Sequence, residues 1–376
     1  MKVLTQIDFT RSLQGKMFDT LLVQVAFFVY GILYLLITFK IRNLPGKTKK
    51  DTANEILYSL LWFAGGLIYP FSYSRTINPA LRTYLNIFTS FAMVGIFGYI
   101  FFEITRQKVL VTRNPSLKDE RTYEKFSKRF DDNYTLKMDI ARKAFHGFVP
   151  AFVIALYVIA ILVHGLFSLG SIISAHDIGI FLIINIGFGG LFLFGAADLL
   201  RLSWFLEDIH VSIFHLTPTS ILNILSKRMH KHELYTFIPT VLILLSFIPF
   251  LPFPFPVFAS ITLIASVSDA MASIIGKLFH EKYPTKGIFP GKNYRFFKNK
   301  NIAGYFAGFI STFVVVLIPF LLIHIEFLSI GEILIIALLA SAVFLLIDIT
   351  SPPINDNFLN SAACGVLMVL LLLLFQ

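Results

Sequence analysis

Long apolar stretches separated by basic loops are the feature that most constrains the fold of this chain. A helix needs about 20 apolar residues to cross the hydrocarbon core of a bilayer. Only 14% of the 376 residues are charged, whereas about a quarter are charged in a soluble domain. The sequence therefore predicts an all-α, polytopic integral membrane protein with about ten transmembrane helices, at 18–39, 56–74, 83–105, 146–167, 178–200, 235–252, 256–277, 302–323, 330–349 and 359–375.

The basic residues gather in alternate connections. The loops after the first, third, fifth and seventh stretches hold 5, 11, 4 and 7 of the 32 Lys and Arg residues. Because positive residues concentrate in cytoplasmic loops, this side is predicted to be cytoplasmic, with the N- and C-termini outside. The net charge of +10 lies between apolar stretches, so we expect an anionic lipid surface or an anionic substrate as its partner, and no nucleic acid.

Two of the cytoplasmic loops are predicted to contain helices. Residues 116–130 carry Tyr123, Phe126 and Phe130 at helical spacing, so we expect an amphipathic helix lying on the membrane surface. Residues 217–233 are a second candidate. The chain is then divided into an N-terminal three-span region with this amphipathic helix, 1–140, and a seven-span region, 141–376.

Ionisable residues inside apolar stretches are costly in a membrane and mark candidate functional sites. Asp198, Asp269 and Asp348 are residues of this kind, with Asp356 close behind. Asp269 lies about 20 Å across the bilayer from the start of its stretch, so all three are expected near the cytoplasmic boundary. For Asp198 and Asp348, an ordinary helix-end residue hydrated by lipid headgroups is an equally good interpretation.

Asp269 has the more unusual surroundings, because small residues flank it on both sides. Small side chains let another backbone or a ligand approach closely. In a regular α-helix Ser266, Asp269 and Ser273 share one face, which predicts a polar stripe inside an apolar span.

Two basic segments accompany these carboxylates. Residues 142–146, RKAFH, open the fourth stretch, and an ordinary positive anchor is the simplest interpretation. The loop 276–301 combines three glycines and two prolines with Lys277, Lys282, Lys286, Lys292, Arg295, Lys298 and Lys300. A loop of this kind beside a membrane-embedded carboxylate suits a nucleoside triphosphate, with lysines contacting phosphates and carboxylates holding Mg²⁺.

Five segments, in the same order, resemble motifs of the CTP-dependent polyprenol kinase family. That family includes dolichol kinase, phytol kinase and the CTP-dependent diacylglycerol kinase, and is similar to phosphatidate cytidylyltransferase. The resemblance covers roughly residues 140–376 and rests on RKAFH (142–146), GAADLLRL (195–202, with Asp198 and Arg201), KHELYTFIP (231–239, with Glu233), SVSDAMASIIGK (266–277) and NDNFLNSAACG (355–365). Ser268 replaces the glycine of the family motif, and Ala303 or, in a second alignment, Pro290 occupies the position of a family glutamate.

The resemblance implies a lipid-kinase-like catalytic region in 141–376, which transfers the γ-phosphate of CTP to the hydroxyl of a lipid alcohol with Mg²⁺ as cofactor. The acceptor is a polyprenol or dolichol, another isoprenoid alcohol, or diacylglycerol, and its tail is expected in the apolar outer half. The implied catalytic residues are Asp269, Asp198, Lys300 and His146, and the implied metal ligands are Asp269 and Asp356. The implied substrate- and nucleotide-binding residues are Arg142, Lys143, Arg201, Ser273, Lys277, Lys286, Lys292 and Asn357.

Other functions remain open at the level of sequence. The same residues suit cytidylyl transfer to a lipid phosphate, and the chain is alternatively a lipid or ion transporter or a catalytically inactive homologue. A transporter usually places its ionisable groups near the bilayer midplane, whereas here they gather at one edge. The expected location is the endoplasmic reticulum membrane in a eukaryote or the cell membrane in a prokaryote, with the active face cytoplasmic.

Overall fold

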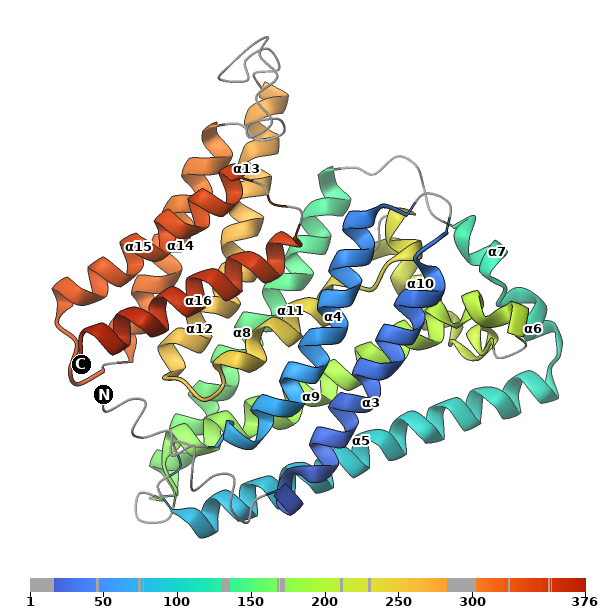
Figure 1. Ribbon diagram of the computed structural model, residues 1–376, viewed down its shortest axis with the longest axis horizontal. Coiled ribbons are helices and arrows are strands. Elements are labelled where there is room, and N and C mark those ends of the chain that lie inside the picture. The colour runs from blue at the N-terminus through green and yellow to red at the C-terminus, as the bar shows by residue number, and fades with distance from the viewer. Residues whose placement is uncertain are drawn as a thin grey trace.

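The computed structural model describes residues 17–44, 47–73, 76, 78–129, 136–167, 169, 173–209, 212–228, 231–282, 302–323, 325–350, 352 and 354–376. All regular structure in these ranges is helical (Figure 1), as predicted. The longer helices are α3 (Met17–Ile41), α4 (Lys49–Ile68), α5 (Pro79–Arg113), α8 (Leu136–Leu166), α9 (Ala175–Leu202), α14 (Ile302–Leu322), α15 (Ile330–Thr350) and α16 (Asp356–Leu374). Between α9 and α14 the chain forms α10 (Thr219–Arg228), α11 (Pro239–Phe247), α12 (Phe255–Leu263) and α13 (Asp269–Lys282).

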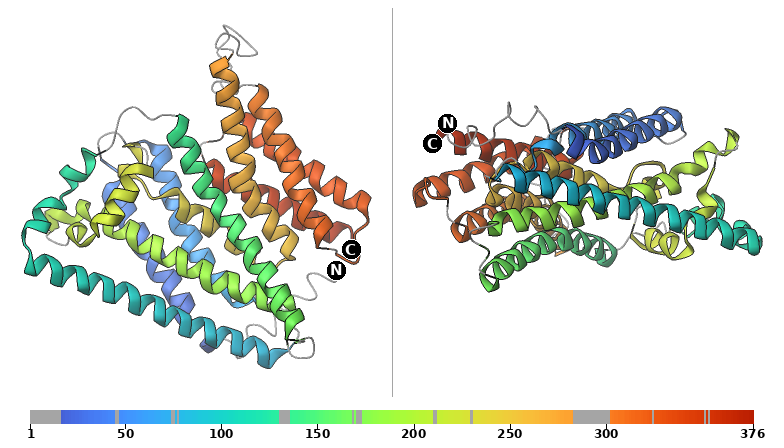
Figure 2. Two further views of the ribbon diagram at one scale, coloured as in Figure 1. Left: turned by 180° about the vertical axis from the view of Figure 1, so that it is seen from behind. Right: turned by 90° about the horizontal axis from the view of Figure 1, so that it is seen from below.

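The long helices run to and fro between two sides of a flattened bundle (Figures 1 and 2). The C-terminal ends of α3, α5, α9 and α13 and the N-terminal ends of α4, α8, α14 and α16 lie toward the upper and right edges of Figure 1. We call this the basic side, because the Lys- and Arg-rich connections join these ends. The opposite ends of the helices lie toward the lower left.

Seven helical segments in the described ranges are long and apolar enough to cross a membrane: Asp19–Ile41, Pro79–Arg113, Gly147–Leu166, Ala175–Leu206, Phe255–Phe279, Ile302–Leu322 and Ile330–Thr350. They support a multi-pass membrane protein. The predicted count of ten is corrected to seven, because three predicted spans fall short in length or hydropathy.

Each of these three has a local reason for being short of a full span. Helix α4 begins at a Thr48–Asp51 capping box, and nearly all residues of its first two turns are polar, which leaves too short an apolar part. The apolar helix Pro239–Phe250, which joins α11 to a short 3-10 turn, is nearly all buried among other helices. The apolar part of α16 covers only Phe358–Leu374.

The outward faces of the helices are strongly apolar. Large side chains such as Leu36, Phe91, Phe101, Phe306 and Leu346 are at least 60% exposed. Exposed apolar surface on this scale marks an interface with another protein or a membrane rather than with water. In a bilayer these side chains face lipid chains, which fits the seven spans.

One continuous core joins the predicted N-terminal and C-terminal regions. The ring of Phe27 in α3 lies 5.6 Å from Trp62 in α4 and 5.1 Å from Phe192 in α9, while Tyr34 lies 4.3 Å from Phe237. Aromatic pairs at these distances contribute about 0.5–1.5 kcal/mol each beyond their burial. The predicted boundary at residue 140 therefore does not separate two cores.

The predicted amphipathic helix at 116–130 is formed differently. The described part consists of two short helices, α6 (Ser116–Glu120) and α7 (Tyr123–Ser127). Phe126 is buried in a small cluster with Phe214, Leu222, Leu234 and Ile238, and Tyr123 stacks on Trp204 with ring centroids 3.5 Å apart. The aromatic face thus packs on the protein itself, because the 203–238 segment offers it an apolar partner. It is therefore not free to insert into a membrane surface, as the prediction of an amphipathic surface helix requires.

Helices α13 and α14 pack closely through glycine. A Cβ atom at Gly304 would lie 2.8 Å from the backbone carbonyl oxygen of Ala272, whereas a Cβ at Gly98 in α5 would have no atom within 4 Å. We expect Gly304→Ala to push the two helices apart and to destabilise the protein by about 1–3 kcal/mol. The matched variant Gly98→Ala is expected to be neutral or slightly stabilising. Thermal unfolding of both proteins in detergent checks this, and equal Tm values would contradict the close packing.

Candidate functional site

Two predicted site residues from distant parts of the sequence meet in the structure. Lys143 lies in α8, and Asp269 is the first residue of α13. Lys143 Nζ donates to Asp269 Oδ2 at 2.7 Å and to the Asp269 backbone carbonyl oxygen at 3.3 Å. Their side chains are only 9% and 19% exposed. Both charges lose much of their hydration, and the cost of this desolvation can exceed the attraction between them. Stability alone therefore does not explain the pair, and we take it as the centre of the candidate site.

The pairing follows from the antiparallel packing of α8 on α12 and α13. Toward the other side of the membrane, Tyr157 in α8 stacks on Phe255 at the start of α12, with ring centroids 3.6 Å apart. Lys143 precedes Tyr157 by the same number of residues that separates Phe255 from Asp269. The stacked rings and the ion pair therefore mark two levels of one helix–helix contact.

A π-helical turn, η7 (Ile264–Ser268), immediately precedes Asp269. π-turns inside α-helices are uncommon and occur frequently at functional sites. The turn changes the helical register between Ser266 and Asp269, whereas the predicted polar stripe assumed a regular α-helix. The hydroxyl of Ser266 donates to the Thr262 carbonyl oxygen of its own helix at 2.8 Å. The hydroxyl of Ser268 is fully buried and has no hydrogen-bond partner among the described residues.

Helices α15 and α16 bring two further predicted carboxylates to one level. Cys364 Sγ donates to the Ala340 carbonyl oxygen at 3.4 Å, which fixes the antiparallel register of the two helices. Asp348 and Asp356 each lie about 12 Å from this contact toward the basic side, at 1.5 Å per residue. Asp348 is buried, whereas Asp356 is exposed at the start of α16.

Asp269 and Asp356 each lie about two helical turns beyond a contact between α12 and α16, counted along their own helices. Gly365 in α16 lies against Ile261 in α12, since a Cβ atom on the glycine would be 3.0 Å from the isoleucine side chain. From this contact Asp269 and Asp356 both lie about 12–14 Å toward the basic side. The predicted gathering of these carboxylates at one edge remains a prediction.

The described carboxylates do not form a closed metal cage. Within the described ranges no three His, Cys, Asp or Glu side chains come close enough to hold one metal ion. Mg²⁺ commonly uses one or two carboxylates together with substrate phosphates and waters. Asp269 and Asp356 carry the ligand type that such a site uses, and their assignment as metal ligands remains a prediction.

Asp198 and Arg201 form a different, fully buried pair in α9. Arg201 Nη2 lies 2.6 Å from Asp198 Oδ1, with side chains 1% and 0% exposed. The guanidinium also donates to the carbonyl oxygens of Glu233, Leu234 and Thr236 at 2.7–3.2 Å.

The other oxygen of Asp198 completes this arrangement. Asp198 Oδ2 accepts from the Ile238 backbone N–H at 3.0 Å and from the Tyr34 hydroxyl at 3.3 Å. The pair therefore joins α9 to α3 and to the segment before α11. It lies away from Asp269, since α8 packs between α9 and α13, and its substrate role remains a prediction.

A third ion pair, which is also buried, was not predicted from the sequence. Lys47 Nζ binds the Glu55 carboxylate, with side chains 0% and 2% exposed, and donates to the Tyr235 carbonyl oxygen at 3.3 Å. Burial lowers the pKa of Lys47, and the neighbouring carboxylate opposes that shift. The position of Glu55 at the edge of an apolar stretch could have indicated a buried carboxylate. Its partner Lys47 lies in a loop, however, and only the fold brings the two side chains together.

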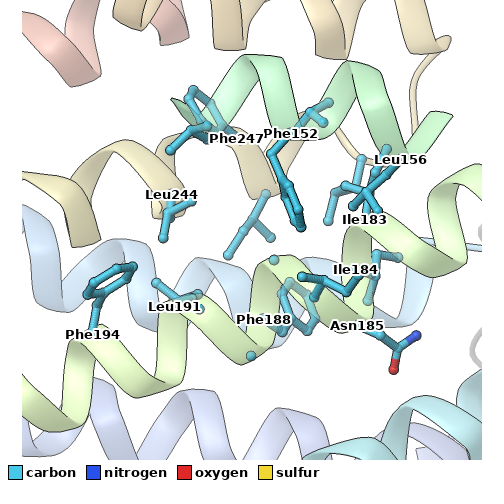
Figure 3. A pocket seen from close by; sticks show the side chains of 18 of the residues that line it. Phe152, Leu156, Ile183, Ile184, Asn185, Phe188, Leu191, Phe194, Leu244 and Phe247 are labelled. Carbon is cyan, nitrogen blue, oxygen red and sulfur yellow. The ribbon is translucent and has the colours of Figure 1, made fainter. Parts of the chain in front are cut away.

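A cavity of about 510 Å³ lies between α8 and α9 (Figure 3). Its walls come from α5, α8, α9, α11 and α12, and include Phe152, Leu156, Phe188, Leu191, Leu244 and Phe258. Among the described residues of the lining, Asn185 is the one with a polar side chain, and its amide points away from the cavity in Figure 3. Cavities of this volume hold small-molecule ligands in many proteins.

The structure describes some of the remaining predicted site residues and not others. Ser273 is half-buried and Lys277 exposed on successive turns of α13 beyond Asp269. Arg142, His146 and Asn357 belong to α8 and α16, but their side chains lie outside the described residues, as do Lys286, Lys292 and Lys300 altogether.

Comparison with known proteins gives no match. No family model matches the chain, and neither a curated protein nor a solved structure is significantly similar to it.

Proposed function

We propose that this protein is a membrane kinase that transfers the γ-phosphate of CTP to the hydroxyl of a lipid alcohol at the basic side. The observation that carries the proposal is the Lys143–Asp269 ion pair. It joins the RKAFH and SVSDAMASIIGK segments, although Lys143 and Asp269 are 126 positions apart in the sequence. A π-turn before Asp269 adds the kind of backbone irregularity found at functional sites.

The residues fit phosphoryl transfer, which needs positioning and charge stabilisation more than covalent chemistry. Lys143 is the cation that holds the Asp269 carboxylate and is positioned to meet an incoming phosphate. Asp269 either binds the acceptor hydroxyl or contributes to a Mg²⁺ site shared with the nucleotide. Lys277, exposed two turns further along α13, extends the positive surface toward the triphosphate.

Isotope labelling tests the proposal and separates the reaction classes. We expect purified protein in lipid nanodiscs to transfer label from γ-labelled CTP to a polyprenol, or to another lipid alcohol in a small panel. Label arriving from α-labelled CTP on a lipid phosphate would instead indicate cytidylyl transfer. If neither label reaches any lipid and CTP with Mg²⁺ does not raise the Tm, the kinase proposal fails, and a transporter or an inactive homologue takes its place.

A further inference from the structure

We propose that the cavity between α8 and α9 binds the hydrocarbon chain of the acceptor lipid and holds its hydroxyl end toward the basic side. That the chain belongs to an acceptor rests on the proposed function. That the cavity takes a hydrocarbon chain rests on its walls, its opening and its place in the bundle.

The walls of the cavity exclude water as a stable occupant. Asn185 is the one polar residue in the lining, and its Nδ2 donates to the Phe181 carbonyl oxygen at 2.7 Å and to Thr89 Oγ1 at 3.3 Å. Its amide is thus directed to α5 and to its own helix. A buried water needs two to four polar partners, and the Asn185 amide is the one polar side chain that the described lining offers. A hydrocarbon chain needs no polar partner, and it can fill the cavity through van der Waals contacts with the walls.

The cavity opens toward the surrounding bilayer. Phe148 and Phe152 in α8 and Ile186 and Phe194 in α9 line it and are between 36% and 62% exposed. These residues lie on helices long and apolar enough to span a membrane. A lipid chain is therefore the molecule already present at the opening, and it can enter sideways between α8 and α9.

Two glycines leave room for the chain. Gly187 and Gly190 of α9 both line the cavity, and a Cβ atom at either position would have no other atom within 4 Å. Their missing side chains keep this part of the cavity open. They also provide positions at which the cavity can be filled without disturbing a neighbouring helix.

The cavity and the ion pair share α8 and the continuous helical segment formed by α12 and α13. Val149 in α8 lines the cavity and is about 9 Å along the helix axis from Lys143, about a third of a turn around it. Phe258 in α12 also lines the cavity, and the same continuous helical segment, Phe255–Phe279, carries Asp269. A lipid whose chain lies in the cavity would thus bring its hydroxyl to the level of the Lys143–Asp269 pair.

Helical spacing extends this connection toward the basic side. Positions 142, 146, 149 and 153 follow one stripe of α8, and the last two belong to the cavity wall. Arg142 and His146 therefore occupy helix positions directly beyond the end of the cavity. The motif-like RKAFH segment then lies where the head of the bound lipid leaves the apolar walls.

Photo-crosslinking tests the chain site directly. The probe is a polyprenol with a diazirine on its last isoprene unit, added to the purified full-length protein in nanodiscs. We expect the label on peptides that contain the lining residues of α8 and α9. Gly187→Leu and Gly190→Leu, which fill the cavity, should each reduce this label at least fivefold. Matched fillings on the lipid-facing surface of α5, Gly95→Leu and Gly98→Leu, which also meet no atom within 4 Å, should leave it unchanged.

Two further measurements distinguish failure of the chain site from failure of the proposed function. If the wild-type protein phosphorylates lipid alcohols, the filled variants should raise KM for long-chain alcohols several-fold and leave KM for a short-chain alcohol unchanged. If the filled variants lose the crosslink but the wild-type protein has no kinase activity, the proposed lipid-chain site is supported and the proposed kinase function is wrong. Equal crosslinking in all four glycine variants, with unchanged Tm values, would overturn the chain site even if the kinase is active.

Discussion

Asp269→Asn is expected to lower CTP-dependent phosphorylation of lipid alcohol by at least about 100-fold, the usual effect of removing one electrostatic contact to a transition state. The substitution keeps the shape of the side chain but removes the negative charge that lies 2.7 Å from Lys143 Nζ. The expected loss is in kcat, because Asp269 is proposed to act on the reacting groups rather than on the lipid tail. Initial rates with labelled CTP measure it, and Asp119→Asn, on the exposed α6 helix, is the control.

A double variant separates a catalytic role of Asp269 from a structural one. Breaking a buried ion pair on one side leaves the other charge unpaired, which destabilises a protein, whereas replacing both partners by apolar residues is often neutral. Lys143→Met combined with Asp269→Leu should therefore restore the Tm lost in either single variant. If activity returns along with the Tm, the pair is structural and the proposed role of Asp269 is wrong.

Arg201→Met is expected to destabilise the protein by about 3–5 kcal/mol, the range for breaking a buried ion pair. The substitution leaves the buried carboxylate of Asp198 without its cation. It also removes the donor from three backbone carbonyl oxygens in 233–236. Each buried polar group left without a hydrogen bond costs about 1–3 kcal/mol. A fall in Tm of about 5–15 °C follows.

A second pair with the same spacing provides the control for this prediction. Glu103 and Arg106 in α5 are also three residues apart and form an ion pair of 2.6 Å, but their side chains are 22% and 51% exposed. Arg106→Met should leave the Tm nearly unchanged, because water and salt screen an exposed ion pair. Thermal unfolding in detergent compares the two variants. A wild-type Tm for Arg201→Met, together with a raised KM for CTP, would show that Arg201 binds nucleotide, as the family resemblance implies, and does not hold the fold together.

Most of the fold was predictable from local patterns. Every predicted span overlaps a helix of the structure, because a long apolar stretch needs no distant partner to satisfy its backbone hydrogen bonds in a membrane. The count was less accurate, since α11 is nearly enclosed by other helices and a buried helix can be as apolar as a spanning one. The segment 116–130 shows the same limit, because an aromatic stripe does not tell a membrane surface from a protein surface.

For the candidate site, too, some features were predictable from the sequence and others were not. The sequence by itself determined that the chain is helical and has several stretches apolar enough to span a membrane, because hydropathy and helical length depend only on neighbouring residues. Only the tertiary structure decided that Asp269 meets Lys143 across 126 positions of sequence, that Asp198 is enclosed with Arg201, and that α8 and α9 leave an apolar cavity between them. Such contacts depend on which helix faces pack together and in which register, and no local pattern of residues specifies that.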